Sequence, residues 1–521
     1  MHAPAERERA TGVLITERDH CHSLVSAPLR PTNNRIHTSS LLPENPTGFS
    51  DTILNGDQHA RYHQKGISIL NKLFNILKPK EKTIISKCCN RKEFVIDDYL
   101  YNQIMSGEAV VFAGAGISTE SRNILPFTFY EEIAKELDLL NSKLSFPELM
   151  EKYSNLDDGR RRLVQKIQKR FDYIESFSFL ERQTTRFHKE LATLYPIKTI
   201  ITTNWDLYFE KYCNAISFIS NEDMAFWDDN KRSVLKIHGS ISNYGTIIAT
   251  TNDYKEAEES LHKGLLGSKL KSILAEKNII FIGYSYSDTD FQEIYNFVQS
   301  SIGKFNKQSY VITPFEAEAK KFNELGFKPI ITDGTYFIEE IKIRAIKEKK
   351  IFSDSIYEDA EWLLELLNEE HNKIHSSINI KEYPHIIYSM AYQDGMMDGL
   401  ERALNFKASG EYSHPCYLNG IADMYDKILD GKIDDNKYLD ISYVDGYNLA
   451  IMFLILTKED RPEEYPSLYF VFGTSDIKSI NDLKKALKIF PSDFKEEYKY
   501  AQKIVANIGD NDTYHHKPFF Y

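Results

Sequence analysis

Two polar residues that follow short apolar runs carry the clearest potential for chemistry. His238 follows the run Val234–Ile237 and precedes Gly239, and Asn204 follows the run Thr199–Ile201. An imidazole titrates near neutral pH and can act as a general base. A carboxamide can hold a sugar hydroxyl or a water without adding charge. Taken alone, the histidine is more typical of a satisfied core residue than of a base, and an Asn in this position can cap a helix.

A glycine turn follows the apolar run 109–113. It reads Gly114, Ala115, Gly116, Ile117, Ser118. Glycines between a strand and a helix let backbone amides approach a pyrophosphate, and the helix N-terminus favours its charge. A tight turn without a ligand is the alternative. The third glycine of the dehydrogenase fingerprint is replaced by Thr119, and no acidic residue ends a second strand about twenty positions on. Hydride transfer is therefore disfavoured.

Further polar residues lie at the ends of the same kind of run. Asp206 can accept hydrogen bonds from hydroxyls, or it can begin a helix. Gly283 and Ser285 follow the run 279–282 and could contact an adenosine ribose. Asp288 is expected to cap a helix over residues 291–298 or to hold a loop.

These residues need a scaffold in which strand ends meet, and the sequence predicts one. Short apolar runs alternate with helical patterns, which is typical of a doubly wound α/β fold with a Rossmann-type parallel sheet. The strands are expected at 109–113, 199–201, 234–237, 246–249, 279–282 and 310–312, and the intervening helices at 129–140, 187–194 and 261–275.

The chain divides into four predicted parts. Residues 1–65 are expected to be a disordered extension and residues 66–105 a helical lead-in, with helices at 67–77 and 97–105. Residues 106–314 form the α/β domain. Residues 315–521 are expected to form a mostly helical α+β domain with a regulatory or partner-binding role. Its helices are predicted at 357–371, 387–404, 444–456 and 483–489, and a strand at 467–472.

Composition narrows the function classes. The formal net charge is -12, which does not suit a broad nucleic-acid surface. Five cysteines form no CxxC pair, so a four-cysteine zinc module is excluded. No apolar run could span a bilayer, and the first residues lack a signal core, so a cytoplasmic location is expected. His515 and His516 have no Cys or acidic neighbour at metal spacing, and we expect them to be exposed. No metal is predicted.

The order of the motifs is more specific than any one of them. A GAGIS turn, a TxNxD segment and an HG pair occur in this order, each after an apolar run. Over about residues 107–314 the chain resembles the sirtuin-like domains. Within them it is most similar to the NAD-consuming branch of bacterial anti-phage defence proteins, the Thoeris effector and its relatives. The resemblance implies that Asn204 and His238 are the catalytic pair. It also implies that the NAD site is lined by Gly114, Ala115, Gly116, Ser118, Asp206, Gly283, Ser285 and Asp288.

The chain also departs from the protein-deacylating sirtuins. Residues 124–129 keep Pro126 but lack the Asp and Arg of the family's PDFR element, and no cysteine lies between His238 and Cys416. A peptide acceptor groove is thus unsupported, and water is the expected acceptor. The resemblance implies an NAD+ hydrolase that depletes NAD+ in an abortive-infection response. Because unrestrained turnover would poison the host, we expect control by homo-oligomerisation, by a partner defence protein or by a ligand of the C-terminal domain. The alternatives are a deacylase or ADP-ribosyltransferase, or a non-catalytic nucleotide sensor. A helical histidine, His188, is expected to have a packing role.

Overall fold

A computed structural model describes most of the chain from residue 91 onward. The described residues are 91–121, 124–286, 288–434, 437–456, 466–472, 474, 477–489, 494–509 and 512–519. The extension predicted at 1–65 and the helix predicted at 67–77 lie outside these residues. The second lead-in helix is present as α3 (Asp98–Met105), capped by the Asp97 side chain, which accepts from Tyr99 N.

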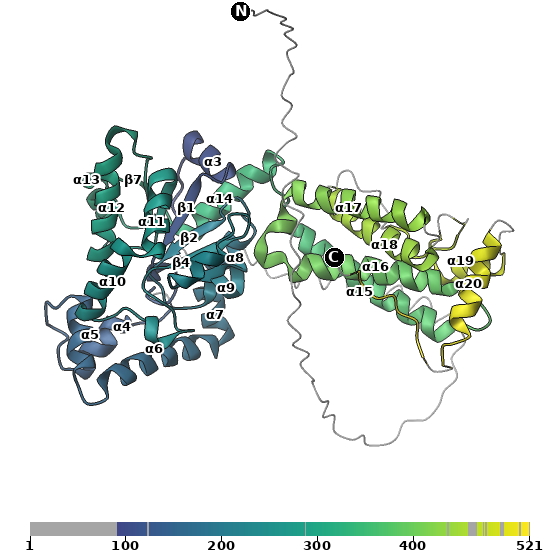
Figure 1. Ribbon diagram of the computed structural model, residues 1–521, viewed down its shortest axis with the longest axis horizontal. Coiled ribbons are helices and arrows are strands. Elements are labelled where there is room, and N and C mark those ends of the chain that lie inside the picture. The colour runs from purple at the N-terminus through teal and green to yellow at the C-terminus, as the bar shows by residue number, and fades with distance from the viewer. Residues whose placement is uncertain are drawn as a thin grey trace, which may run out of the picture. The chain divides into compact units, whose positions relative to one another are not determined.

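The first part of the described chain is built on a sheet of seven parallel strands in the order β3-β4-β2-β1-β5-β6-β7 (Figure 1). The strands are β1 (Ala109–Ala113), β2 (Thr199–Thr202), β3 (Ile216–Phe218), β4 (Ser233–Lys236), β5 (Asn278–Ile282), β6 (Tyr310–Thr313) and β7 (Lys328–Ile331). The register pairs Ala113 with both Thr202 and Ile282, and Thr202 with Lys236. The carboxyl ends of the four central strands are therefore level at one edge, where open α/β sheets bind ligands.

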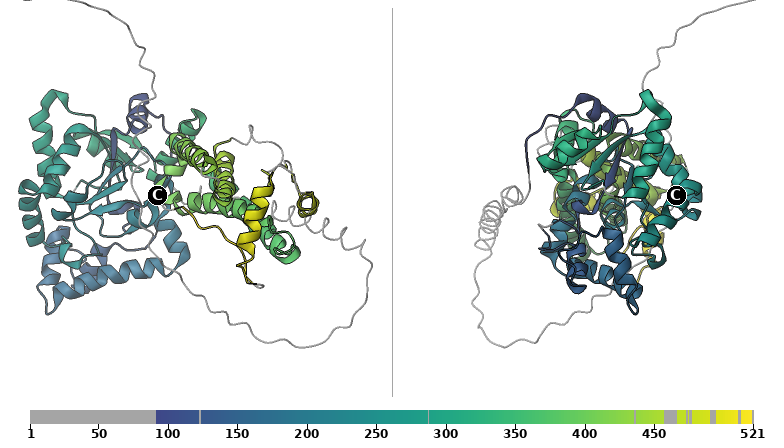
Figure 2. Two further views of the ribbon diagram at one scale, coloured as in Figure 1. Left: turned by 45° about the vertical axis from the view of Figure 1, so that its right-hand side comes forward. Right: turned by 90° about the vertical axis from the view of Figure 1, so that its left-hand side faces the viewer.

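Helices cover both faces of the sheet (Figure 2). All five residues of β1 are buried, and alternate side chains enter two separate cores. One core packs against α3, α8 (Arg186–Ala192), α9 (Tyr208–Cys213) and α14 (Gly334–Lys347). The other packs against α11 (Leu265–Glu276), α12 (Thr289–Ile302) and α13 (Glu316–Glu324). Strands buried on both faces read as continuous apolar runs, and the predicted doubly wound α/β class is confirmed.

A group of helices between β1 and α8 forms a smaller core of its own. The group comprises α4 (Phe129–Glu136), α5 (Phe146–Ser154) and α6 (Gly159–Glu175). The next helix, α7 (Ser178–Thr184), packs its Leu180 in a separate small cluster with Ile174. Trp205 from the loop after β2, and Ile241 and Ile247 from the loop after β4, pack into the core of this group. The group therefore lies against the strand-end loops that carry the predicted site.

Two expectations about the sheet were wrong. Residues 246–249 do not form a strand, because Ile247 and Ala249 pack into the α4–α6 core while Ile248 N donates to His238 O at 3.1 Å. The sheet also continues past residue 314. The edge strand β7 pairs with β6, and α14 then packs on the sheet. The short strands β3 and β7 have partly exposed residues, so neither reads as a buried run.

The second part of the described chain is helical. It contains α15 (Ser355–Ser377), α16 (Ile386–Asn405), α17 (Pro415–Asp434), α18 (Tyr438–Ile455), α19 (Ile480–Lys488) and α20 (Lys495–Val505) (Figure 1). The prediction of a strand at 467–472 was wrong. The described residues there form one isolated bridge, between Val471 and Thr474. Leu468 and Tyr469 instead fill the helical core.

The two C-terminal histidines differ in exposure. The His515 side chain is 56% exposed, as expected, but that of His516 is only 9% exposed, so the expectation was wrong for it. The His516 ring stacks on Tyr443 with centroids 4.5 Å apart, and its Nε2 pairs with Asp440 at 3.0 Å. Acidic partners are supplied by distant helices, which local spacing does not reveal. Among the described residues, no helix has the length and apolarity needed to cross a membrane.

Candidate active site

The predicted site residues lie in the loops that leave four neighbouring strands. The glycine turn follows β1, Asn204 and Asp206 follow β2, His238 follows β4, and Gly283 follows β5. Because β4, β2, β1 and β5 are adjacent and parallel, their following loops gather at one edge of the sheet. The structure thus brings together segments that are separated by up to 170 positions in the chain.

The glycine turn packs backbone to backbone against the loop after β5. Gly114 N donates to Ile282 O and Gly116 N donates to Gly283 O, both at 3.0 Å. Gly283 has a φ of +62°, and a Cβ there would lie 2.5 Å from Ile117 N. Only glycine fits such a position. Gly116 and Gly283 are exposed, so a ligand can approach this backbone.

One part of the pyrophosphate argument was wrong. The turn opens a 3-10 helix of three residues, η1 (Ala115–Ile117), rather than a long helix. Ala115 O accepts from Ser118 N at 3.1 Å and from Glu120 N at 3.1 Å. The attraction of a helix dipole for an anion is therefore missing here, and close approach to glycine backbone is the feature that remains.

Three buried polar side chains connect the glycine turn to the segment after β2. Ser118 Oγ donates to Asp206 Oδ2 at 3.3 Å, and Asn204 Nδ2 donates to Ser118 Oγ at 3.5 Å. Asn204 is 4% exposed, and its Oδ1 is buried with no hydrogen-bond partner. An unsatisfied buried acceptor costs about 1–3 kcal/mol. This oxygen is therefore available to a hydroxyl or water donor brought by a ligand.

Asp206 has two roles in the structure. Its Oδ1 accepts from Tyr208 N at 3.2 Å at the start of α9, as in helix capping, while its Oδ2 faces Ser118. Burial raises the pKa of Asp206 to about 6, although the Lys236 ammonium opposes this shift. Asp206 therefore accepts from a hydroxyl and from the first backbone N–H of α9, although Leu207 is the N-cap residue, and its contact with NAD stays a prediction.

Lys236 was not predicted as part of this site. It is 1% exposed, and its ammonium donates to Asp206 O and pairs with Glu210 Oε1 at 3.0 Å. The signal in the sequence was a lysine inside the apolar run of β4. A buried lysine requires partners, so it predicts acidic or carbonyl oxygens at that strand end.

His238 is connected to the loop after β5 through a tyrosine. The His238 and Tyr254 rings pack edge to face with centroids 5.0 Å apart, and Tyr254 OH donates to Asp288 Oδ1 at 2.9 Å. Tyr254 comes from α10 (Thr251–Lys263). Asp288 stands at the N-cap of α12, but its side chain makes no capping hydrogen bond. The expected capping bond was therefore wrong, and Asp288 fixes Tyr254 instead. Ser285 is exposed between Gly283 and Asp288.

The backbone around His238 is fixed on both sides. His238 O accepts from Trp205 Nε1 at 3.1 Å and from Ile248 N at 3.1 Å. Gly239 has a φ of +80°, and a Cβ there would lie 1.9 Å from Thr246 O. The glycine is required by its own loop, because the chain turns sharply to bring the 246–248 segment against His238.

His188 has the environment of a packing residue. It is fully buried, and its ring lies 4.6 Å from the Phe209 ring and 5.6 Å from the Tyr208 ring, centroid to centroid. Burial, with the Lys236 charge, lowers the pKa of His188 to about 3. The ring is therefore neutral at pH 7.

A basic side chain from α6 holds the loop that follows the glycine turn. Arg170 donates to Phe127 O at 2.9 Å and to Thr119 O at 3.1 Å, and it pairs with Glu120 at 3.2 Å. A hollow of about 640 Å³ lies beside this loop. It is lined by Leu125, Pro126, Phe127, Glu132, Glu136, Tyr153, Arg162, Gln165, Lys166, Lys169, Arg170 and Tyr173, and by none of the predicted site residues. The hollow adjoins the site through this loop and is distinct from it.

Residues 198–344, which include β2 to β7 and the loop that carries His238, match the family model described as a SIR2-like domain. The chain is 27% identical over 302 residues to the NAD(+) hydrolase ThsA of Cytobacillus dafuensis, covering 51% of this chain and 59% of that protein. It is 25% identical over 262 residues to the NAD(+) hydrolase ThsA of Bacillus cereus (strain MSX-D12), covering 49% and 53%. Defense-associated sirtuin 2 of Bacillus subtilis is 25% identical over 266 residues, 49% of this chain and 24% of that protein.

The predicted resemblance to sirtuin-like defence proteins is confirmed by these matches. The matched segment spans about half the length of the ThsA relatives, 59% and 53% of the two named above.

Proposed function

We propose that this chain hydrolyses the bond between nicotinamide and ribose in NAD+, and that it depletes NAD+ in an anti-phage response. The observation that carries the proposal is the unpartnered, buried Asn204 Oδ1 beside Ser118 and Asp206, at the end of strands whose glycine turn admits a ligand. Several relatives that carry the name NAD(+) hydrolase support the same activity. The roles of individual residues are part of this proposal.

In the proposed reaction, the C–N bond to nicotinamide breaks and a water oxygen forms a bond to the anomeric carbon. Nicotinamide leaves as the neutral base, and the proton of the attacking water passes to the His238 imidazole. Asn204 Oδ1 accepts from a ribose hydroxyl or from that water. The Ser118 and Asp206 side chains hold the Asn204 carboxamide in position. General-base assistance of this kind contributes about 10²–10⁴-fold in rate.

The site-lining residues have positioning roles in this scheme. Gly114, Ala115, Gly116 and Gly283 would present backbone to the dinucleotide, and exposed Ser285 could contact its adenosine ribose. Asp288 acts through Tyr254 on the His238 ring. A peptide acceptor is not part of the scheme. The reaction uses no metal ion.

The test follows nicotinamide release from NAD+ by chromatography, with purified full-length protein in its active oligomeric or partner-bound state and no peptide acceptor. We expect ADP-ribose and nicotinamide in equal amounts, and a loss of about 10²–10⁴-fold in H238A and N204A. The matched control is H262A, because His262 is exposed at the end of α10. Turnover that appears only with an acylated peptide would support the deacylase instead. NAD+ binding without product would support the sensor.

An NADase inside its host must be restrained until infection. We therefore propose a cytoplasmic protein whose activity is controlled by homo-oligomerisation or by a partner defence protein. The test measures NAD+ in cells that express the wild type or H238A, before and after phage infection, together with native mass. NAD+ loss only after infection and only in the wild type is expected. A monomer that is fully active without infection contradicts the proposed control, and equal NAD+ levels in both strains after infection contradict the proposed activity.

A further inference from the structure

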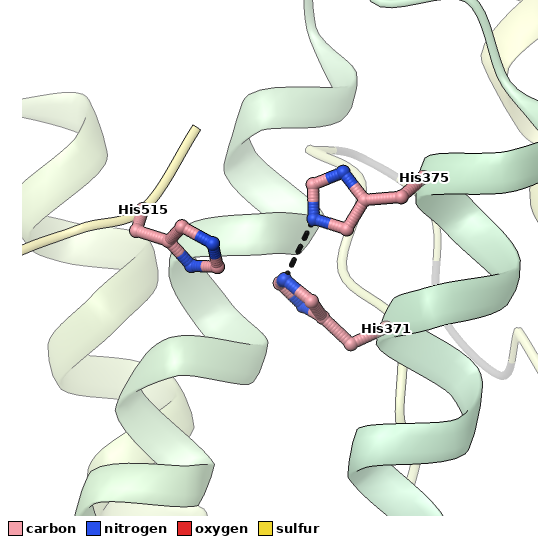
Figure 3. Close-up of side chains that lie close together, drawn as sticks. All are labelled: His371, His375 and His515. Atoms are coloured by element: carbon pink, nitrogen blue, oxygen red, sulfur yellow. Dashed lines mark hydrogen bonds between the residues drawn. The ribbon is translucent and has the colours of Figure 1, made fainter. Parts of the chain in front are cut away.

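Three histidines outside the sheet converge on one point. His371 and His375 lie one turn apart on α15, and His515 lies in the C-terminal segment 512–519. One nitrogen from each ring lies within 4.8 Å of the other two. Figure 3 shows the three rings pointing toward one another, with the Nε2 atoms of His371 and His375 2.9 Å apart. Two imidazole nitrogens only 2.9 Å apart must have either a hydrogen or a cation between them.

The hydrogen bonds around His371 determine which of its nitrogens is free of a proton. Gln393 Nε2 donates to Leu468 O at 2.8 Å, which orients the amide so that its Oε1 faces the imidazole. That oxygen lies 3.0 Å from His371 Nδ1 and can only accept. Nδ1 therefore carries the proton, and Nε2 of the neutral ring presents its lone pair to the cluster.

His515 is oriented in the same way by a carboxylate. Its Nδ1 lies 3.1 Å from Asp394 Oδ1, so Nδ1 is the donor and Nε2 is left for the cluster. A ring nitrogen bonded to a carboxylate or amide oxygen, with the other nitrogen directed at a common point, is the usual outer arrangement of histidine metal ligands. Gln393 and Asp394 are adjacent on α16 and are both buried. Two buried side chains of α16 thus orient two of the three rings of the cluster: Gln393 orients His371, and Asp394 orients His515.

A cation accounts for all three rings better than a hydrogen bond does. A hydrogen on His375 Nε2 can be donated to His371 Nε2, 2.9 Å away, but it leaves the nitrogen that His515 directs at the cluster without a role. A cation can accept lone pairs from all three rings, and neutral imidazole is the form that ligates metals.

We propose that His371, His375 and His515 bind a divalent transition-metal ion, with Zn²⁺ as the first candidate. Three imidazole nitrogens suit Zn²⁺ and its neighbours in the first transition row. With Zn–N distances of about 2.0–2.1 Å, tetrahedral geometry requires ligand nitrogens roughly 3.3 Å apart. The His371–His375 pair need only open slightly, and a water completes the fourth position.

The ion would fasten the C-terminal segment to the helical region. Two of its ligands lie on α15 and the third on the segment. The segment also bonds to α16 through His516 N and Asp394 Oδ2 at 2.7 Å, and to α18 through His516 Nε2 and Asp440 Oδ1 at 3.0 Å. Metal binding to the folded state alone stabilises it by mass action. The melting temperature of the helical region should therefore rise with Zn²⁺. This inference does not rest on the proposed NAD+ hydrolysis.

The test uses full-length protein without a polyhistidine tag, stripped with a chelator and titrated with Zn²⁺ alone. We expect one equivalent of bound zinc by mass spectrometry of the metal content, and a higher melting temperature. Co²⁺ should give the visible absorption of a tetrahedral nitrogen site. The principal variant is H515Q, because His515 is largely exposed and its loss does not threaten the core. H515Q should lose stoichiometric zinc and the melting shift.

The matched control is H516Q, the neighbouring histidine on the same segment, which lies outside the cluster. It should keep the stoichiometric zinc even if its own melting temperature falls. D394N should keep the fold and weaken zinc affinity by about 10–100-fold. Zinc uptake that is equal in the wild type and H515Q, or no uptake by the wild type, would overturn the proposal. In the second case the 2.9 Å contact is a hydrogen bond between the two rings.

Discussion

The two halves of the described chain gather their buried polar groups by different means. In the sheet domain, Asn204, Asp206 and His238 follow adjacent parallel strands, so the topology alone brings them to one edge. In the helical region, His371 lies near His515 only because a C-terminal segment returns to α15. No general rule of helix packing places those two residues together. The residues of a site at the edge of a parallel sheet can therefore be predicted from the sequence, because they follow the strands. The residues of a site in a helical bundle cannot be predicted in this way.

Glycine is used in both halves, for different purposes. In the sheet domain, Gly116 and Gly283 are exposed backbone next to one another at the strand ends. In the helical region, a Cβ on Gly395 would lie 1.9 Å from Tyr443 O, and one on Gly446 would lie 2.0 Å from Tyr392 O. Helices α16 and α18 thus cross in backbone contact. Gly116 and Gly283 thus leave space for a ligand beside the strand ends. Gly395 and Gly446 leave space for the backbone of the neighbouring helix.

The largest expected effect is on the loop that holds His238. In G239A, the left-handed φ of +80° and the Cβ contact of 1.9 Å with Thr246 O act together. We expect a loss of about 3–5 kcal/mol in the free energy of unfolding by urea. G245A is the control, since its nearest atom would be 3.6 Å away and its φ is ordinary. A G239A protein as stable as G245A would show that the described turn is wrong.

The next effect is a pH dependence specific to the sheet domain. The Asp206 carboxyl has a pKa of about 6 in the folded chain and 3.8 as its ordinary value. Between about pH 4 and pH 6 the folded protein therefore holds a proton that the unfolded chain has released, so wild-type stability falls as the pH rises. The asparagine of D206N does not titrate. The stability of D206N relative to the wild type should rise by up to about 3 kcal/mol from pH 4 to pH 7.

Urea denaturation at each pH measures this difference. D229N is the control, because Asp229 has a lowered pKa and a side chain that is 83% exposed. Because the folded pKa of Asp229 is lowered from 3.8, the stability of D229N relative to the wild type should change little over the same range, and in the opposite direction to that of D206N. A flat D206N difference would mean that Asp206 is not held in a desolvated position.

A smaller effect tests the crossing of α16 and α18. G446A places a methyl group 2.0 Å from Tyr392 O and should cost about 1–3 kcal/mol through overpacking. Gly431 is an exposed position of α17 with no atom within 4 Å of its Cβ, so G431A should stabilise by up to about 1 kcal/mol because alanine favours helix. Thermal melts followed by circular dichroism distinguish the two. We expect G446A to lower the melting temperature and G431A to raise it. A change of the same sign in both variants would contradict the close crossing of α16 and α18.

The same contrast explains what the sequence could predict. The runs 109–113, 199–201, 234–237, 279–282 and 310–312 became β1, β2, β4, β5 and β6, because strands buried on both faces are continuously apolar. The run 246–249 has the same composition but packs on helices, which no local pattern distinguishes. Edge strands such as β3 were missed because their residues are partly exposed.

The residues of the site were predicted better than their contacts. The sequence pointed to Asn204, Asp206 and His238, and the fold brings their segments to one edge, while their catalytic roles stay predictions. It did not predict Tyr254 or Lys236, because each acts through a partner on another element. The histidine cluster is the extreme case: Asp394 and His515 are 121 residues apart in the chain.

The smallest expected effect comes from removing two helix caps, one in each half of the described chain. Both losses should lower thermal stability, but only one should change the kinetics of NAD+ hydrolysis. Thr250 Oγ1 accepts from Asp253 N at 3.2 Å at the start of α10, and Ser479 Oγ accepts from Asp482 N at 3.2 Å at the start of α19. T250A and S479A should each cost about 1 kcal/mol in thermal melts. Tyr254 lies in the first turn of α10 and packs on His238. Only T250A should therefore raise the KM for NAD+ or lower its turnover. An equal loss of activity in S479A would mean that the helical region also acts on the site, through contacts such as that of Arg232 Nη1 with Ala408 O at 3.3 Å, and it would contradict a specific role for the α10 cap.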